Sequence, residues 1–260
     1  MRLSQGQLNL LETCPRKFQQ TYLDQLGSLT ALEHLERLTW GSQFHLLMQQ
    51  RELGLPVAAI ALKDDPLQQC IDALIQSAPE VFRQDQHPFR QSEHRRTLEW
   101  QGHLLTVVYD LLILDEQQAQ ILDWKTYPRP QNRHWLERDW QTRLYPFVLT
   151  ETSEYAAEQI SMTYWFVRAG DERSPQPQPL RFHYSTALHY QTGKDLSHLL
   201  RQLNQWLQEY EAGQPFPEVE ETTGCCQSCH FAMRCQRQSA QSTSLQEPLP
   251  AVADIPEVAL

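Results

Sequence analysis

The sequence contains no apolar run that approaches the roughly 20 residues of a membrane span, and its first residues lack the apolar region of a secretory signal. It also contains no Walker A loop and no internal repeat, so the chain is not itself a helicase or another P-loop ATPase. Positive charge is scarce: the formal net charge of −10 argues against a protein that coats nucleic acid by charge alone. We therefore expect a cytoplasmic protein without a membrane partner.

The composition is that of a globular protein large enough to bury a core, with 260 residues of which 40% are apolar and 21% charged. The charge is unevenly spread, because residues 209–260 hold eight acids and two arginines. Local basic groups occur elsewhere, for example at Arg129, Arg133 and Arg138. Overall acidity therefore weakens a DNA-binding interpretation but leaves room for a local binding surface.

Hydrophobic periodicity predicts helices before and after a group of strands. The expected helices begin at Ser4 and near Pro15, and further helices cover about 31–53, 66–77, 134–150 and 186–211. The expected strands cover 94–101, 103–115, 119–125, 160–168 and 180–184, and the first three form a β-meander. Pro146 should kink its helix or end it early, and the polar segment from residue 239 should be disordered.

The segment ILDWKT, residues 121–126, places an acid and a lysine in an otherwise apolar strand. Asp123 and Lys125 share one face of this strand, roughly 6–7 Å apart along it, and could together hold a metal ion and a phosphate. Asp110 interrupts the preceding apolar strand, and burying a carboxylate is costly unless it is paired or bound to a metal. A divalent cation would let the two carboxylates converge. A structural salt bridge between Asp110 and Lys125 is the alternative, which the short pattern alone favours.

Further polar residues could belong to the same site. Gln141 and Tyr145 are four residues apart, so they share one face of the helix that follows the ILDWKT strand. His45 follows WGSQF on a predicted helix and could supply a metal ligand, although a lone histidine is more often a surface or core residue.

Cysteines are clustered in a manner typical of metal ligands in a cytosolic chain. Cys226, Cys229 and Cys235 have chelate spacing, and Cys14 lies far upstream beside a proline. Four thiolates suit either a zinc ion or an iron–sulfur cluster, and a distant fourth ligand would staple the two ends of the chain together. Cys225 is an alternative to Cys226, whereas Cys70 is expected to be an ordinary buried thiol.

Taken together, these motifs resemble a known family. CPRKF, GSQFH, an aspartate on a strand, ILDWKT, QTRLY and a C-x2-C-x5-C cluster occur in that order between residues 4 and 236. The sequence resembles the RecB-like branch of the PD-(D/E)XK nuclease superfamily. It is most similar to its iron–sulfur members, which include CRISPR-associated RecB-like exonucleases and the nuclease domains of AddAB-type enzymes.

The resemblance implies a role for each matching residue. The implied ligands of a catalytic Mg²⁺ or Mn²⁺ ion are His45, Asp110 and Asp123. Lys125 becomes the catalytic lysine, and Gln141 with Tyr145 becomes a Q-x3-Y motif that helps to hold the DNA and the site. The implied ligands of a structural [4Fe–4S] cluster are Cys14, Cys226, Cys229 and Cys235. Glu93 corresponds loosely to an acid that often precedes the meander, and Val108 and Tyr109 stand where many relatives have a glycine-containing turn.

The implied fold is α/β: a restriction-endonuclease-like mixed central sheet flanked by helices, with a helical lobe and the cluster joining the N- and C-terminal segments. We expect one nuclease domain over residues 1–238, with a helical part at 1–90, a catalytic core at 91–185, a C-terminal helix and cysteine cluster at 186–238, and a disordered tail at 239–260. Trp135 and Trp140 are candidates for stacking on bases, whereas Trp165 is expected in the core.

The implied activity is metal-dependent hydrolysis of phosphodiester bonds by a DNA nuclease, an exonuclease on single-stranded ends, in DNA repair, recombination or a related process. A helicase or a CRISPR-adaptation protein is the expected partner besides DNA. One alternative is a catalytically inactive nuclease-like module that binds DNA or a helicase. Others are a zinc-stapled regulatory protein and a metal-dependent hydrolase acting on a different phosphoester.

Overall fold

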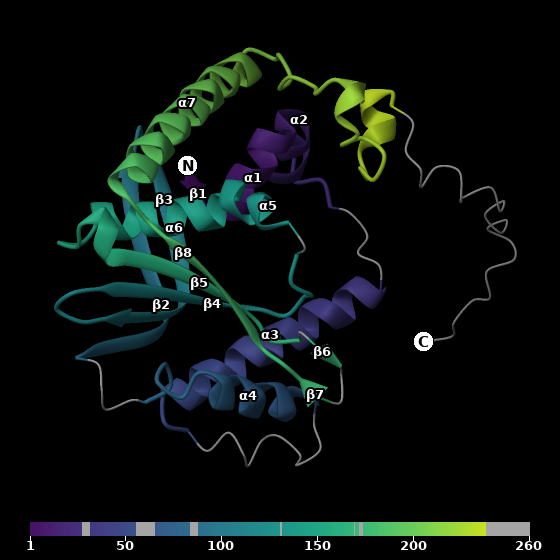
Figure 1. Cartoon of the computed structure of the whole chain (residues 1–260). Helices are drawn as coiled ribbons and strands as arrows, with labels where there is room; N and C mark the ends of the chain where they lie inside the picture. The colour runs from purple at the N-terminus through teal and green to yellow at the C-terminus, as the bar shows by residue number, and fades with distance from the viewer. Residues whose placement is uncertain are drawn as a thin grey trace, which may run out of the picture. The chain divides into compact units, whose positions relative to one another are not determined.

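The computed structural model describes residues 1–27, 32–55, 66–83, 88–130, 132–168, 170–171 and 174–237 (Figure 1). The disorder predicted from residue 239 concerns residues outside this part. The chain separates into two compact units, each described by itself. The larger comprises Met1–Asn9 and Leu29–Gln205, and the smaller comprises Leu10–Ser28 and Trp206–Leu260. The single domain predicted over 1–238 stays a prediction.

The larger unit is built around a six-stranded mixed sheet with the order β1-β3-β4-β5-β8, in which β2 also pairs with β3. Its strands are β1 (Arg2–Leu3), β2 (Phe89–Trp100), β3 (His103–Leu114), β4 (Ala119–Lys125), β5 (Ile160–Phe166) and β8 (Gln178–His183). The β2–β3, β3–β4 and β5–β8 pairs are antiparallel, whereas β1–β3 and β4–β5 are parallel. A short hairpin of β6 (Gly170–Asp171) and β7 (Ser174–Pro175) precedes β8. The predicted α/β class with a mixed central sheet is confirmed.

Two helices cover one face of this sheet, α3 (Leu32–Glu52) and α4 (Pro66–Ser77) (Figure 1). Phe44 and Met48 of α3 join Ile71 of α4 in a buried cluster that also contains Leu122 and Trp124 of β4. Cys70 lies in this cluster as a buried free thiol, as expected. Apolar side chains on two helices and on alternate strand positions thus form the core beneath the sheet.

The opposite face of the sheet is covered by α6 (Trp140–Glu151), which follows the short helix α5 (Arg133–Arg138). We expected one helix over 134–150, but Asp139 ends α5 and caps α6 by accepting a hydrogen bond from the Gln141 backbone N–H. Pro146 lies inside α6, which continues to Glu151, so the expected early end of this helix is wrong. Because β4 and β5 are parallel, α5 and α6 form the crossover that joins them.

The last long helix, α7 (Thr186–Glu211), contributes residues to both units, as does α1 (Gln5–Thr13). Within the larger unit, α7 buries leucines such as Leu196 and Leu200, and its Ser197 accepts a hydrogen bond from the indole of Trp100. A single 3-10 turn, η4 (Ala157–Gln159), precedes β5. No helix in the described ranges is long and apolar enough to cross a membrane.

The smaller unit is helical and irregular. Its elements besides parts of α1 and α7 are α2 (Pro15–Phe18), the π-helical η1 (Gln19–Leu23) and the 3-10 turns η5 (Glu221–Thr223) and η6 (Ala232–Cys235). The rings of Phe18, Trp206 and Tyr210 surround the buried Phe216. Gln19 accepts a hydrogen bond from the Phe216 backbone N–H, which joins segments from the two ends of the described chain.

Candidate metal centre and active site

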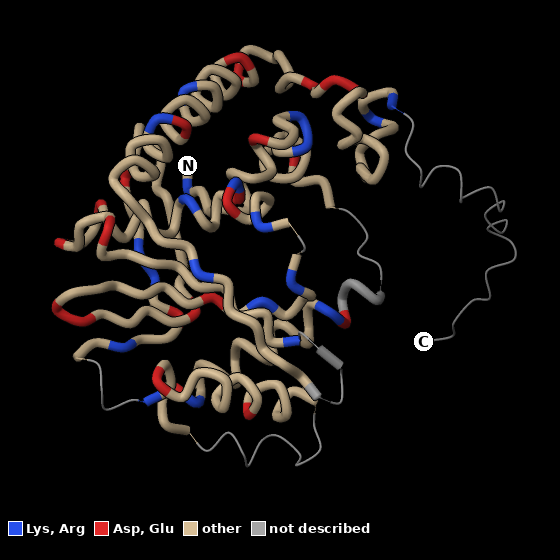
Figure 2. Tube along the Cα trace, in the orientation of Figure 1, with Lys and Arg blue, Asp and Glu red and all other residues tan. Residues whose placement is uncertain are grey.

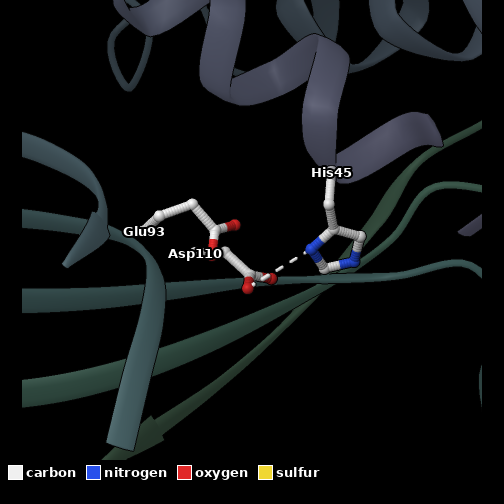
Figure 3. A group of neighbouring side chains, drawn as sticks. All are labelled: His45, Glu93 and Asp110. Atoms are coloured by element: carbon white, nitrogen blue, oxygen red, sulfur yellow. Dashed lines mark ion pairs between the residues drawn. The ribbon is translucent and has the colours of Figure 1, made fainter. Parts of the chain in front are cut away.

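One histidine and two acids converge in the larger unit (Figure 3). His45 of α3, Glu93 of β2 and Asp110 of β3 each offer a ligand atom, and these atoms lie within 4.8 Å of one another. His45 Nδ1 is 3.3 Å from Asp110 Oδ1. The other ring nitrogen, Nε2, lies 3.0 Å from the carbonyl oxygen of Trp124, to which it donates. A histidine that ligates a metal normally anchors its second nitrogen in this way, leaving Nδ1 for the ion.

The pairing register of the sheet explains why Glu93 meets Asp110. Ser92 pairs with Leu111 and His94 pairs with Tyr109, so Glu93 and Asp110 stand opposite each other between these pairs. Glu93 has a φ of 49°, in the left-handed region that glutamate rarely adopts. Two carboxylates opposite each other also repel. Backbone strain and repulsion therefore coincide here, which is characteristic of functional sites.

Asp110 lies at a point where β3 turns. Tyr109 donates a hydrogen bond to the carbonyl of Tyr145 on α6, whereas Leu111 belongs to the core cluster of α3 and α4. Residues two apart in a regular strand share a face, so the strand must rotate between these two positions. At this turn Asp110 Oδ2 accepts a 2.7 Å hydrogen bond from the Trp124 backbone N–H. The glycine that many relatives have in this turn is absent, and the left-handed residue is Glu93 on the neighbouring strand.

Asp123, Lys125 and Gln141 form a second group. Lys125 Nζ lies 2.7 Å from Asp123 Oδ1 and donates a 2.6 Å hydrogen bond to Gln141 Oε1. The amide nitrogen of Gln141 donates to the other carboxylate oxygen, Asp123 Oδ2. One glutamine thus acts as donor to the acid and acceptor from the lysine, and it holds both in place. Since Trp124 points into the α3–α4 core, its neighbour Asp123 points to the opposite face, toward α6.

The electrostatics of this second group favour a charged lysine. Burial lowers the pKa of Lys125, but the Asp123 carboxylate together with Tyr127 and Asp110 outweighs burial and raises it, so the ammonium persists at neutral pH. Burial raises the pKa of Asp123, and Lys125 opposes that shift. Asp123 Oδ1 is buried, and the Lys125 ammonium at 2.7 Å is its described partner.

The acids around His45 raise the pKa of its imidazole. Burial lowers its pKa, but the hydrogen bond to Asp110 and the charges of Asp110, Asp123 and Glu93 outweigh burial and raise the pKa to about 9. Burial, Asp110 and Asp123 raise the pKa of Glu93, partly offset by His45. In the absence of a metal ion, a proton on His45 therefore balances the excess of carboxylates.

A glycine lets α3 approach the end of β4 closely enough to place His45. A Cβ atom on Gly41 would lie 3.1 Å from Thr126 Oγ1, the hydroxyl that directly follows Lys125. Gly41 is one helical turn before His45, so the spacing at this contact governs how far the imidazole reaches. Any larger residue would have to displace Thr126 or the helix.

The predicted residues are placed as follows. His45 and Asp110 are brought together, and Asp123, Lys125 and Gln141 form the adjoining group. Tyr145 is buried one turn beyond Gln141, and burial with the charges of Asp123 and Asp110 raises its pKa, which keeps the phenol protonated.

The salt bridge between Asp110 and Lys125 that we weighed is not formed in the described structure, where the ammonium pairs with Asp123. Glu93, not Asp123, completes the tightest ligand group. The resemblance gave Glu93 only a loose correspondence, and extending β2 back to residue 89 would have placed it opposite Asp110.

Five of the six cysteines lie in the smaller unit and line one cavity, together with basic side chains that include Arg16, Lys17 and Arg237. The lining cysteines are Cys14, Cys225, Cys226, Cys229 and Cys235. Among the described residues, no three of these thiols lie within 4.8 Å of one another. A tetrahedral zinc ion with bonds of about 2.3 Å would hold its thiolates about 3.8 Å apart. The described thiols therefore do not form a group as compact as a zinc site.

Residues 2–236 match the family described as the PD-(D/E)XK nuclease superfamily. The curated proteins contain no match to this sequence. One similar crystal structure, described as a "Putative exonuclease" from Eubacterium rectale, is 11% identical, with 94% of this chain and 93% of that chain covered and a TM-score of 0.54. That identity supports a likeness of fold alone. The crystal structure of SSO0001 is 10% identical over 90% of this chain and 85% of that chain, with a TM-score of 0.38. Because the family match extends over nearly the whole described chain, this protein belongs to the PD-(D/E)XK nuclease superfamily.

Proposed function

We propose that this protein is a metal-dependent DNA nuclease of the RecB-like branch that degrades single-stranded ends by hydrolysing phosphodiester bonds. The observation that carries the proposal is the Gln141 side chain, which bridges Asp123 and Lys125 beside the His45, Glu93 and Asp110 group. Membership of the superfamily supports the hydrolytic chemistry.

We assign His45, Asp110 and Asp123 as ligands of a Mg²⁺ or Mn²⁺ ion, and we add Glu93. Carboxylate oxygens and one imidazole suit these hard divalent cations. The donors fit, because His45 is anchored through Nε2 and one ligand atom each of His45, Glu93 and Asp110 lies within 4.8 Å of the others. A cation bound there supplies a Lewis acid for the phosphate and lowers the pKa of a bound water.

Lys125 serves the phosphate in this proposal. An ammonium has three N–H donors, and the contacts to Asp123 and Gln141 use two of them. The third can donate to a phosphate oxygen or to the attacking water. Its cation also faces the rings of Tyr164 at 4.9 Å and Tyr127 at 5.9 Å, which restrict its direction.

We further propose that Cys14, Cys226, Cys229 and Cys235 hold a [4Fe–4S] cluster with a structural role. All four line one cavity, which supports one metal group shared by the four thiolates. Burial and the neighbouring Cys14 and Cys229 raise the pKa of Cys226, whereas Cys225 points its thiol at the Thr223 carbonyl. These contacts support Cys226 over Cys225 as the ligand.

The test is anaerobic purification of the full chain followed by assays on end-labelled single-stranded DNA, duplex DNA and RNA with Mn²⁺. Asp123→Asn and Lys125→Met should each abolish degradation, and a brown protein with bound iron supports the cluster. A wild-type protein that binds DNA without degrading it is the non-cutting module instead. Roles in repair or recombination and a helicase or CRISPR-adaptation partner stay predictions.

A further inference from the structure

The segment that follows β4 carries exposed aromatic and basic side chains away from Lys125. Tyr127 and Trp135 are 40% and 59% exposed, although large aromatic residues are usually buried. Arg129 and Arg133 lie between them and are also exposed, and the basic positions of this stretch can be followed in Figure 2. Alternating aromatic and cationic side chains next to a catalytic group are typical of surfaces that bind single-stranded nucleic acid.

Tyr127 is the residue of this segment closest to the chemistry. Its ring lies 5.9 Å from Lys125 Nζ, and its edge packs against the fully buried Phe166 with ring centroids 5.8 Å apart and an interplanar angle of 71°. Phe166 therefore supports the ring from behind while part of it faces solvent. A supported aromatic ring beside the lysine offers a flat apolar surface to a base attached to the phosphate that Lys125 contacts.

The side chains of Arg129 and Arg133 both contact the edge strand β8. Pro128 and Pro130 fix φ on both sides of Arg129. Arg129 Nη1 is 3.4 Å from Gln178 Oε1, and Arg133 Nη2 donates a 3.1 Å hydrogen bond to the Arg181 carbonyl. A segment held in this way loses little conformational entropy when a flexible strand binds to it.

The two arginines differ in how far their charge is compensated. Arg133 pairs with Glu137 at 2.9 Å, and its guanidinium lies over the Phe182 ring at 4.5 Å. Arg129 has the amide of Gln178 as its described partner and no described carboxylate. Arg129 is therefore the residue of this segment best suited to bind a backbone phosphate.

The two tryptophans that we considered for base stacking besides Trp135 are buried. Trp140 is fully buried at the start of α6 and stacks with Arg143, and Trp165 belongs to the α3–α4 core cluster. The expectation for Trp140 is thus wrong, because the helix phase set by the Asp139 cap directs it inward. Tyr127, by contrast, is exposed beside the site.

We propose that the described residues of 127–130 and 132–135 guide a single-stranded end to the active site, with the Tyr127 ring stacking on the base next to the scissile phosphate and Arg129 binding a backbone phosphate. This inference rests on the proposed nuclease function, and it names a positioning residue for that reaction. Stacking needs an unpaired base, so Tyr127 also favours single strands over duplex ends.

Binding without cleavage tests the inference independently of activity. The full-length protein in EDTA is titrated with a short single-stranded DNA that carries 2-aminopurine, and binding is followed by anisotropy and by quenching of the base. Tyr127→Leu should weaken binding about 5- to 150-fold and remove the quenching, whereas Tyr127→Phe should keep both. Tyr190→Leu, at a tyrosine 73% exposed on α7, is the matched control and should bind as wild type does.

Two further readouts separate positioning from mere folding. Tyr127→Leu should raise KM for single-stranded ends more than it lowers kcat, and it should leave the melting temperature unchanged. Arg129→Gln should reduce the slope of log affinity against log salt concentration by about 0.7, because one phosphate contact is lost. Unchanged binding by Tyr127→Leu would overturn the inference, as would equal losses in the Phe and Leu variants, which would assign the effect to the hydroxyl. A wild-type protein that shows these binding effects but no Mn²⁺-dependent degradation would overturn the nuclease function and this role together, leaving only the binding surface.

Discussion

Raising the pH from 7 to 9 should strengthen metal binding at the His45, Glu93 and Asp110 site. A metal ion needs the neutral imidazole, but the surrounding carboxylates raise the pKa of His45 to about 9 in the metal-free protein. Affinity should therefore rise about tenfold for each pH unit and be about 100-fold lower at pH 7 than above pH 9. The His45 side chain is 32% exposed, so screening by water and salt makes this an upper value.

The assay is isothermal titration with Mn²⁺ under anaerobic conditions at several pH values between 7 and 9, in buffers of different ionisation enthalpy. Wild type should release close to one proton per ion at pH 7, and the His45→Gln variant should release less and lose most of the pH dependence. The raised pKa of Glu93 adds proton release mainly at lower pH. An affinity that does not vary with pH, or an equal slope in His45→Gln, would refute the reasoning.

The proton on His45 also makes the stability of the metal-free protein depend on pH. Stability should fall as the pH rises, whereas metal affinity should increase. Because the folded-state pKa of His45 lies above the unfolded value of 6.5, the stabilisation is complete below pH 6.5 and is lost as the pH rises through about 9. The melting temperature of the metal-free wild type should therefore fall relative to His45→Gln across this range. Added Mn²⁺ should abolish the difference in slope.

Other substitutions test neighbouring features. Gln141→Leu should lower kcat at least tenfold, since Lys125 loses its aligning acceptor, and should cost about 1–3 kcal/mol of stability, since the buried Asp123 loses a donor; a changed KM alone in steady-state assays would count against this role. Gly41→Ala should weaken Mn²⁺ binding measured by calorimetry, because the added methyl group contacts Thr126 just after β4 and moves His45. Gly6→Ala is the control, since a Cβ atom there meets nothing within 4 Å. Glu52→Ala should destabilise the fold by about 3–5 kcal/mol in urea titrations, because it leaves the buried Arg90 guanidinium without its carboxylate partner; a loss below about 1 kcal/mol would contradict the importance of this pair.

The parts of the site that sequence reasoning reached are those fixed by local pattern. An apolar strand interrupted by an acid and a lysine predicts both the strand and the direction of Asp123, because side chains alternate. Helical spacing likewise predicts that Gln141 faces that strand, although the cap at Asp139 that divides α5 from α6 was missed. These features depend on neighbours within a few residues.

Glu93 could not be predicted with the same security, because its position depends on pairing across a whole hairpin. Residues 89–93 are mostly polar, so the pattern gave a strand beginning only at residue 94, and the left-handed backbone of Glu93 has no signature in a glutamate. Trp140 could not be placed from the sequence for a similar reason. The cap at Asp139 starts a new helix, and the phase of that helix directs Trp140 into the core and not toward DNA. Register and phase are set by tertiary structure and not by propensity.

The kink at Glu93 also bears on solubility. β2 is 12 residues long and, within the described chain, pairs on one edge only, with β3. A flat edge of that length would offer a row of unpaired N–H and C=O groups to any other extended chain, including another copy of this protein. The left-handed residue divides the edge into two shorter stretches, and the exposed, charged side chain of Arg95 interrupts it further. The backbone conformation of Glu93 thus directs its carboxylate to the site and also makes the exposed edge of β2 less suited to pair with another strand. Replacing Glu93 with valine should therefore remove a metal ligand and promote concentration-dependent self-association.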